Sequence, residues 1–312
     1  MSSSMRLVLQ TAGITRQAVH KHLKREAAFQ EKLSGLIQEA DLLRAEHPGC
    51  GVEKMYHTLR PDFIGRDKFI DLFMQLGYRV KYQKNYHRTT IPVCSKYQNL
   101  IQGLMVRDRN IVWQSDITYF LMNGQYYYLV FIIDVYTKKI LGFRASDHLR
   151  AEANLAAMKM AIRNSSGSLE DLIHHSDRGS QYIDKEYIAL LERNKIQISM
   201  GEKAQDNAYA ERINGTIKNE YLKYWSPKSL SQLQRMLKQA VDHYNNKRVH
   251  NELPGRVSPG KFEETLINLK SQKRPTVIIY ADGNYKIKVA SSHFDYEPKE
   301  RPLAHNCPIE MN

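Results

Sequence analysis

Cysteine is scarce in this chain, and its cysteines form no paired motif. Cys50, Cys94 and Cys307 are far apart and lack the C-x-x-C spacing of zinc knuckles and redox sites. They are also too few for a disulfide framework. A disulfide-stabilised secreted domain and a cysteine-ligated zinc site are therefore excluded, and we expect the reducing environment of the cytoplasm.

Long apolar runs are lacking as well. No stretch approaches the roughly 18 residues that a membrane-spanning helix needs, and the N-terminus lacks the apolar core of a signal peptide. Acidic residues are outnumbered, with 33 Asp and Glu against 46 Lys and Arg, so that the net charge is +13. A surplus of this size favours nucleic acid as a partner, ahead of a membrane surface. A basic protein without such a partner is the other interpretation.

The 312 residues leave room for about two domains, and the first of them has helical periodicity. Residues 5–28 are predicted as two short helices, with 14–23 as a recognition helix that has Thr15 as its N-cap. Arg16 and Lys21 would then face outward and contact DNA. An ordinary helical hairpin is the alternative. The residues expected to face inward are Ile14, Ala18, Val19 and Leu23.

A helix over 26–46 has apolar residues spaced by four and three, which is typical of either a coiled coil or a packed helix. Residues 52–59 and 66–76 are predicted as a second helix–turn–helix. The segment 78–88 interleaves basic residues with tyrosines and contains no acid. We expect it to be a DNA-contacting arm rather than a solvated linker. Its candidate DNA-binding residues are Lys81, Lys84 and Arg88.

From residue 111 the pattern changes from helical to alternating. Strands are predicted at 111–122, 126–136 and 139–145, and Asn123-Gly124 between the first two is a strong hairpin signal. Helices and further strands then alternate. These are a helix at 150–164, a strand at 172–175, a helix at 184–194, a strand at 196–200 and a helix at 206–223. A meander followed by two βα steps predicts a mixed α/β sheet, whose strand-to-loop junctions are where sites form.

Three acidic residues lie where a carboxylate is unusual. Asp116 lies in the middle of the first apolar strand, where an unpaired charge costs several kcal/mol. Asp177 directly follows the fourth strand, and Glu211 lies at the border of the buried face of the last helix. Structural ion pairs would explain each acid taken alone. Asp134, which also lies in an apolar strand, is the rival candidate.

Converging carboxylates need a cation between them. Two carboxylates ~4 Å apart repel each other by about 4 kcal/mol at an effective dielectric near 20. Hard oxygen ligands favour Mg²⁺ or Mn²⁺, and two such ions about 3.5–4 Å apart promote phosphodiester chemistry. Together with a basic surface that holds DNA, the three acids predict metal-dependent cleavage or joining of DNA.

Four motifs occur in order along the chain. They are Trp113-x-x-Asp116-Ile-Thr-Tyr119, His175-Ser-Asp177-Arg-Gly-Ser-Gln-Tyr182, Asn207-Ala-x-Ala-Glu211-Arg-x-Asn-Gly-Thr-x-Lys218 and Tyr244-Asn-x-x-Arg248-x-His250-x-x-Leu253. Together they closely resemble the catalytic subunit of bacterial insertion-sequence transposases of the insertion-sequence-three family, whose core is like retroviral integrase. The resemblance covers about 100–265, and 50–80 looks like the helix–turn–helix that precedes that core. Any one motif is weak, whereas four in order are highly specific.

The resemblance implies an RNase H-like mixed five-stranded sheet with flanking helices and a DDE triad of Asp116, Asp177 and Glu211 as catalytic residues and metal ligands. It implies Mg²⁺ as the cofactor, with Mn²⁺ able to substitute. The reaction would be nicking at the terminal inverted repeats of the element, followed by attack of the freed 3′-hydroxyl on target DNA. The expected partners are double-stranded DNA, further copies of the chain and an upstream-frame protein, in the cytoplasm at the bacterial nucleoid.

Four further residues of the motifs are expected to contact DNA or to serve the site. They are Lys218, which matches a DNA-end contact of the family, Asn207, which would orient Glu211 or contact DNA, Arg178 and Arg248. For Arg248 packing is the alternative, and for His250 a structural role is favoured. The interval from Asp177 to Glu211 is slightly shorter than usual in the family, which we interpret as a trimmed loop between Met200 and Asp206.

These predictions divide the chain into four parts. Residues 1–90 form a helical DNA-binding region, 91–109 a linker, 110–268 the catalytic core, and 269–312 a β hairpin and tail. The hairpin is predicted from 276–280 and 285–290, which flank Asp-Gly-Asn. The alternative function is a DNA-binding regulator with a decayed, inactive core.

Overall fold

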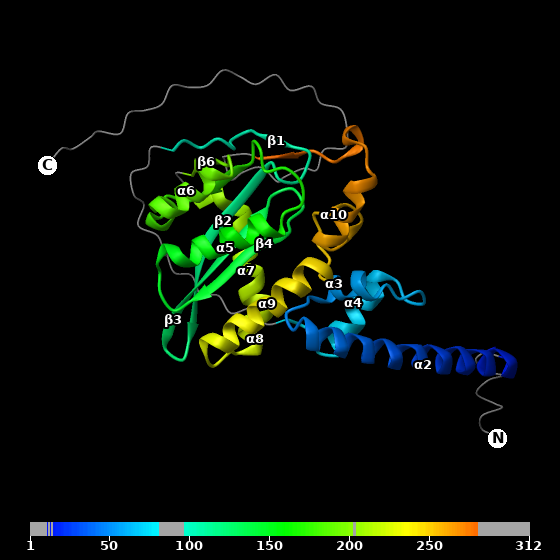
Figure 1. Ribbon diagram of the computed structural model, residues 1–312. Coiled ribbons are helices and arrows are strands. Elements are labelled where there is room, and N and C mark those ends of the chain that lie inside the picture. The colour runs from blue at the N-terminus through cyan, green and yellow to red at the C-terminus, as the bar shows by residue number, and fades with distance from the viewer. Residues whose placement is uncertain (1–10, 12, 14, 81–96, 202–203, 280–312) are drawn as a thin grey trace. The chain divides into compact units, whose positions relative to one another are not determined.

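The computed structural model describes residues 11, 13, 15–80, 97–201 and 204–279. The chain divides into two compact units, Met1–Lys81 and Tyr82–Asn312. Figure 1 shows the helices and strands of both. None of the described helices is long and apolar enough to cross a membrane. The division of the chain into four parts stays a prediction.

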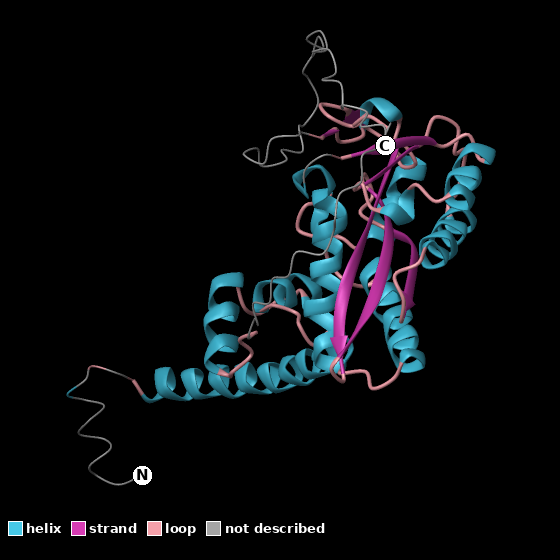
Figure 2. Ribbon diagram, turned by 90° about the vertical axis from the view of Figure 1, so that its left-hand side faces the viewer, coloured by secondary structure: helices cyan, strands magenta, loops and turns pink. Residues whose placement is uncertain are grey.

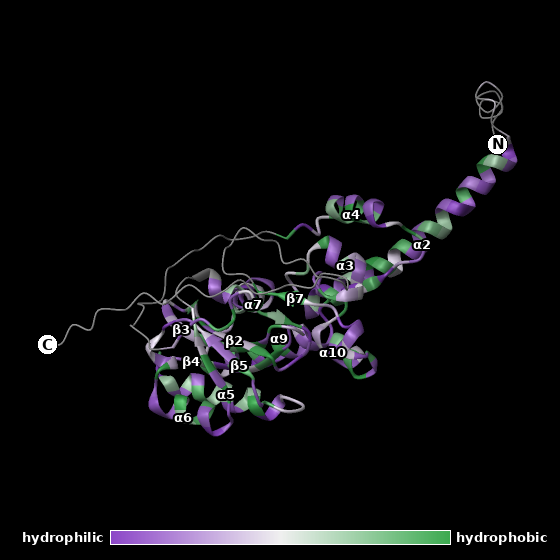
Figure 3. Ribbon diagram, turned by 90° about the horizontal axis from the view of Figure 1, so that it is seen from above, coloured by the Kyte–Doolittle hydropathy of each residue, from purple (hydrophilic) through white to green (hydrophobic). Residues whose placement is uncertain are grey.

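The first unit is dominated by one long helix, α2 (Arg16–Glu46), of 31 residues. The prediction of separate helices before and after residue 26 is wrong, because nothing between them breaks the helix. Thr15 is the N-cap, as predicted, and its hydroxyl accepts a hydrogen bond from Ala18 N at 3.1 Å. The N-terminal half of α2 does not have the predicted inward face, since Ala18 and Leu23 are exposed. Along the helix, hydrophilic and hydrophobic residues alternate (Figure 3).

The C-terminal half of α2 packs against the two helices predicted over 52–76. These are α3 (Val52–Leu59) and α4 (Arg66–Gln75), and both predicted helices are confirmed. The small core that they share with α2 includes the buried residues Leu33, Leu36, Ala40, Met55, Phe69 and Phe73. The apolar spacing of 26–46 therefore serves packing within this unit, because each apolar position of that spacing contacts α3 or α4 or the residues beside them.

The second unit contains a five-stranded sheet in the order β4-β3-β2-β5-β6. Its strands are β2 (Val112–Met122), β3 (Gln125–Asp134), β4 (Ile140–Ser146), β5 (Ile173–Ser176) and β6 (Gln197–Met200). The first three pair antiparallel, whereas β5 and β6 run parallel to β2. The predicted turn at Asn123-Gly124 has φ of 52° and 77°, the left-handed pair of a tight hairpin. This is the predicted RNase H-like sheet.

Helices cover both faces of this sheet (Figure 2). Two apolar clusters result: α5 (Ala151–Asn164) and α6 (Lys185–Arg193) pack on one face, and α7 (Ala208–Ile217), α9 (Leu230–Asn246) and α10 (Pro259–Asn268) on the other. A π-helical turn, Lys218–Leu222, and α8 (Lys223–Trp225) continue α7. Short 3₁₀ turns occur at Ser180–Tyr182, Ala204–Asn207, Pro254–Arg256 and Ser271–Lys273.

A two-stranded sheet joins segments that were predicted as a linker and as a hairpin. β1 (Met105–Val106) pairs antiparallel with β7 (Val277–Ile278). The prediction of a simple tether is therefore wrong for 97–109, because Ile101 and Val106 are buried in the core. The first strand of the predicted hairpin exists as β7, and its expected partner at 285–290 lies outside the described residues.

Gly142 on β4 marks a close approach of the sheet to α5. A Cβ built there would lie 2.1 Å from the carbonyl oxygen of Ala157 and 3.0 Å from Ala161 Cβ. Gly142→Ala is therefore expected to lower the free energy of unfolding by about 2–3 kcal/mol, because helix backbone would have to move. Urea unfolding checks this. Gly215→Ala on α7, with only the end of Asn219 at 3.9 Å, is the matched control and is expected to be neutral or stabilising. Equal stability of both variants would contradict the clash.

Candidate active site

Asp116 lies in the middle of β2, and its carboxylate is tied to α7. Asn214 Nδ2 donates a hydrogen bond to Asp116 Oδ2 at 2.7 Å. Alternate residues of a strand share a face, and the neighbours of Asp116 on this face behave alike. Gln114 Oε1 accepts from the backbone N–H of Tyr209, and Thr118 Oγ1 accepts from Lys218 Nζ. The face of β2 that carries Asp116 is therefore bonded to α7 and its continuation along its length.

The regularity of these contacts follows from the geometry of a strand and a helix. Two residues of a strand rise about 6.7 Å and four residues of a helix about 6 Å. Consecutive positions on the Asp116 face of β2 can therefore meet helix positions about four apart. The observed sequence is Gln114 with Tyr209, Asp116 with Asn214, and Thr118 with Lys218. α7 is thus held in register with the strand that carries Asp116.

Asp177 directly follows β5, the strand next to β2. β5 pairs parallel with β2, with Gln114 opposite His175. Two residues further along both strands are Asp116 and Asp177, at the carboxyl end of β5. Neighbouring strands lie about 4.8 Å apart. Asp177 Oδ1 accepts a hydrogen bond from Gly179 N at 3.1 Å, which fixes the turn that follows the strand.

Glu211 comes from the first turns of α7 and is exposed, whereas the helical pattern predicted a position at the border of the buried face. It nevertheless points to the same region as the two aspartates, since its charge raises the pKa of Asp116 and the charge of Asp177 raises the pKa of Glu211. Asn207, Glu211 and Lys218 lie at different depths in the protein. These three residues are buried, exposed and half-buried respectively.

The pKa of Asp116 shows that the charges of the other two acids act on it. Burial, and then the charges of Asp177 and Glu211, raise its pKa from 3.8 to about 7, against the opposing effect of Lys218. Burial first, and then Asp177, raise the pKa of Glu211. Within the described ranges, no group of three or more His, Cys, Asp or Glu side chains is already placed to hold a metal ion. The three carboxylates thus interact through their charges without closing round one point.

The raised pKa of Asp116 predicts that the free energy of unfolding falls as the pH rises. The pKa of Asp116 rises from 3.8 to about 7 on folding, so the folded chain holds more protons between these pH values and loses stability as the pH rises through them. Without divalent cations at pH 8, Asp116→Asn should therefore raise the free energy of unfolding. After allowance for screening the gain is about 1–2 kcal/mol, or about 2–8 °C in Tm.

Thermal unfolding in EDTA at pH 4 and pH 8 measures this difference. The gain should vanish at pH 4, where the wild-type carboxyl is protonated in the folded chain. An equal gain at both pH values would show that Asp116 is not strained by charge.

Lys218 lies beside the acids rather than on an open surface. Its Nζ donates to Thr118 Oγ1 at 2.5 Å and to the carbonyl oxygen of Tyr119 at 3.4 Å. Burial lowers the pKa of Lys218, and the charge of Asp116 opposes this shift. A cation in this position can neutralise part of the negative charge of the site or reach a phosphate that enters it.

Asn207 and Arg248, predicted to contact DNA, are buried and bonded within the protein. Asn207 is 3% exposed and donates from Nδ2 to the carbonyl oxygen of Ser115 at 2.7 Å, on the strand that carries Asp116. Arg248 is 9% exposed and donates to both carboxylate oxygens of Glu220, at 2.7 and 2.9 Å. The predicted DNA contacts of these two residues are therefore wrong, because phosphates cannot reach them. His250 is buried edge-on to Tyr244, as expected for a structural residue.

The rival acid, Asp134, is structural. It is buried at the end of β3 and accepts hydrogen bonds from Asn110 N, Thr137 N and Thr137 Oγ1 at 2.7–2.8 Å. These bonds satisfy both oxygens of the carboxylate, one from Asn110 and one from Thr137 in the turn that follows β3. Arg178, by contrast, is half-buried and directly follows Asp177. It is the arginine next to the acids.

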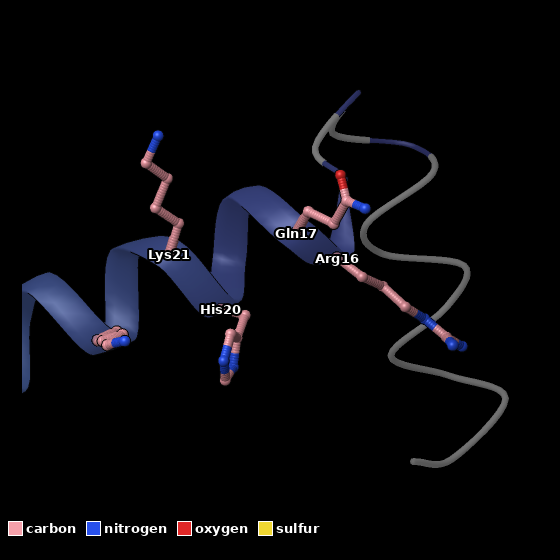
Figure 4. Close-up of a pocket in the computed structure, with 5 residues that line it drawn as sticks. Arg16, Gln17, His20 and Lys21 are labelled. Atoms are coloured by element: carbon pink, nitrogen blue, oxygen red, sulfur yellow. The ribbon is translucent and has the colours of Figure 1, made fainter.

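The N-terminal end of α2 presents basic side chains. Arg16, Gln17, His20, Lys21 and Lys24 line a shallow pocket there. They belong to consecutive turns of one helix and project from it in several directions (Figure 4). Arg16 and Lys21 are exposed, as a DNA contact requires. The other predicted contacts of this region, Lys81, Lys84 and Arg88, lie outside the described residues.

Sequence reasoning missed two residues that touch the site. Asn214 bonds to Asp116 directly, and Gln114 holds the start of α7. The helical pattern could have predicted the position of Asn214, because it follows Glu211 by three residues and therefore lies on the same side of the helix. Gln114 carried no such signal, since its partners are backbone groups almost a hundred residues away.

Comparison with known proteins agrees with this geometry. Two family models, both described as integrase core domain, match residues 107–205 and 193–259. A protein of Mycobacterium tuberculosis (strain H37Rv), assigned as the transposase of insertion sequence element IS986/IS6110, is 31% identical over 258 residues, which are 78% of this chain and 92% of that protein. Transposase InsF of insertion sequence IS3A from Escherichia coli (strain K12) is 29% identical over 66% of this chain and 69% of its own.

Among solved structures, the catalytic core domain of HTLV-2 integrase, in complex with magnesium, aligns with a TM-score of 0.41 and 20% identity. The alignment covers 53% of this chain and 99% of that domain. The identity to the mycobacterial relative over nearly its whole length, and the two integrase core matches over the five-stranded sheet, assign the family. This chain belongs to the insertion-sequence transposases that carry an integrase core domain, and its function is DNA transposition.

Proposed function

We propose that Asp116, Asp177 and Glu211 form a DDE centre that uses Mg²⁺ to nick DNA at the ends of an insertion sequence and to join the freed 3′-hydroxyl to target DNA. The observation that supports this most is the mutual effect of the three charges. The charges of Asp177 and Glu211 raise the pKa of Asp116, and the charge of Asp177 raises the pKa of Glu211, although the three residues are far apart in the chain. Perturbed carboxylates of this kind are typical of functional sites.

The donors of this site fit a divalent cation. They are all carboxylate oxygens, which Mg²⁺ and Mn²⁺ prefer. Repulsion among three acids is unfavourable alone and becomes favourable when a 2+ charge lies between them. Glu211, exposed on α7, is the ligand with room to move toward the aspartates. When bound, the metal would lower the pKa of a water or 3′-hydroxyl and stabilise the leaving oxygen of a phosphodiester.

The residues of the chain would prepare the site for this chemistry. Asn214 holds one oxygen of Asp116 by a hydrogen bond from its side-chain amide. The Gly179 N–H holds one oxygen of Asp177 in the same way. Lys218, beside Asp116, and Arg178, next to Asp177 in the chain, would supply positive charge that binds the phosphates of the DNA end.

The DNA substrate would be held by further surfaces and copies. We propose that Arg16 and Lys21 of α2 contact DNA phosphates, and that the transposase acts as an oligomer, because two ends of an element must be joined in one complex. An upstream-frame protein would be an additional partner. The reaction would take place at the bacterial nucleoid.

The test uses the full chain with duplex DNA that carries the terminal inverted repeats found on either side of its reading frame. With Mg²⁺ or Mn²⁺ we expect nicks at the repeat ends and, with a target duplex, covalent joining; EDTA should abolish both. A decayed regulator would bind the repeats without cutting them under any metal. That result would overturn the proposal.

A further inference from the structure

Gln114 is buried in a position that a hydrophobic residue would normally occupy. It lies on β2 between Trp113 and Ser115, two residues before Asp116 and on the same face. Its exposed fraction is 0%. A buried amide costs free energy unless its hydrogen bonds are made, so its partners show what it is for.

All the partners of the Gln114 side chain are backbone groups at the start of α7. Its Oε1 accepts from Tyr209 N at 3.2 Å and from Ala210 N at 3.4 Å, and its Nε2 donates to the carbonyl oxygen of Asp206 at 3.1 Å. The first N–H groups of a helix have no partner within the helix. The N-cap of α7, Asn207, supplies no capping bond from its side chain. Gln114 therefore caps α7 from a different element.

The side chain of Asn207, at the start of α7, bonds in the opposite direction, to the backbone of β2. Its Nδ2 donates to the carbonyl oxygen of Ser115 at 2.7 Å, and the residue is 3% exposed. Gln114 and Asn207, which we call the amide clamp, thus exchange bonds between β2 and the start of α7. In each case the side-chain amide of one element forms hydrogen bonds with the backbone of the other.

The clamp ends next to the reacting acids on both sides. Ser115, whose carbonyl it holds, is followed by Asp116. Ala210, whose N–H it holds, is followed by Glu211. The backbone positions that carry the two carboxylates are therefore joined by bonds made at the residues next to them.

We propose that Gln114 is a positioning residue of the transposase centre. Through the amide clamp it holds the start of α7 on β2, and thereby sets the reach of Glu211 toward the metal site that it shares with Asp116. This inference rests on the proposed DDE function and adds a residue to it. Sites that bind an ion through ligands on different elements depend on such supporting bonds.

The test compares Gln114→Met in the full chain, which keeps the volume and removes the bonds, with a matched variant elsewhere. Asn245 on α9 also joins a helix to a strand, since its amide accepts from Ile140 N and donates to Ile140 O, both at 2.9 Å. Ile140 is on β4, at the edge of the sheet farthest from β5 and β6. Asn245→Leu therefore removes a comparable pair of buried bonds away from the acids.

Two readouts separate positioning from stability. The first is the Mn²⁺ concentration that gives half of the maximal rise in Tm, without DNA. The second is the nicking rate on repeat DNA against Mn²⁺, together with the affinity for that DNA in EDTA. For Gln114→Met we expect the Mn²⁺ midpoint to rise about tenfold or more and nicking to fall about a hundredfold, with DNA affinity within about twofold. For Asn245→Leu we expect a lower Tm but a wild-type Mn²⁺ midpoint.

The outcomes distinguish a failure of the positioning role of Gln114 from a failure of the proposed DDE function. If Gln114→Met lowers Tm as Asn245→Leu does and leaves the Mn²⁺ midpoint unchanged, Gln114 is structural only and the inference fails. If the wild type itself shows neither a Mn²⁺-dependent Tm nor nicking, the proposed function fails first. Should Gln114→Met not fold, Asn207→Leu removes the other half of the clamp and must shift the Mn²⁺ midpoint in the same direction.

Discussion

Asp116→Asn is expected to bind the repeat DNA as the wild type does and to nick it at least about 10³-fold more slowly, a loss of about 4 kcal/mol in transition-state stabilisation. The same is expected for Asp177→Asn and Glu211→Gln. Each change keeps the shape of the side chain and removes one negative charge from the proposed centre, which would need all three to hold its cations. Gel assays of nicking and of strand transfer, at saturating Mg²⁺ and Mn²⁺, measure the effect.

The control for charge is Asp242→Asn, which removes an exposed acid of α9 and should leave the nicking rate within about twofold, as surface changes usually do. Because the triad acts as one unit, a double variant such as Asp116→Asn with Glu211→Gln should be little worse than either single variant. Nicking by all three single variants at the wild-type rate would end the assignment of the DDE centre.

Arg248→Met is expected to lower the free energy of unfolding by about 3–5 kcal/mol, because it removes a buried guanidinium from the half-buried carboxylate of Glu220 that it binds. The pair is bidentate, at 2.7 and 2.9 Å, and joins the π-helical turn after α7 to the segment after α9. The Arg248 guanidinium also lies 5.4 Å from the centre of the Tyr244 ring. Urea unfolding of the variant measures the loss.

A second measurement separates this structural role from the DNA contact that the motif suggested. Below the unfolding transition, Arg248→Met should bind DNA with the wild-type salt dependence, since a buried side chain releases no counterions from phosphates. Arg16→Ala, which removes an exposed cation, should instead reduce the slope of log K against log salt by about 1 if it contacts a phosphate. A reduced slope for Arg248→Met, with normal stability, would contradict the buried ion pair.

Local order was largely predictable from the sequence. The alternation around Asp116, the Asn123-Gly124 turn and the apolar helical stripes fixed the strands and most helices, because these depend on neighbours a few residues away. The four motifs identified the family and the three acids. The continuity of α2 was mispredicted, because the apolar spacing of residues 26–46 does not extend into the polar N-terminal half of the helix. The strand β1 was mispredicted, because a strand of two residues has no periodic pattern.

What the sequence determined by itself is the set of acids, the strands and helix that carry them, and the family to which the chain belongs. Only the tertiary structure decided which polar residues serve the site. It bonded Gln114 of the Asp116 strand to the start of α7, and it placed Asn214 and Lys218 against that strand. It also buried Asn207 and Arg248 within the protein. The physical reason is that a motif shows only the type of side chain. An asparagine or arginine in a motif looks the same whether its side chain bonds to backbone, to a carboxylate or to a phosphate. Its partner is chosen by contacts between elements distant in the chain, which no local pattern records.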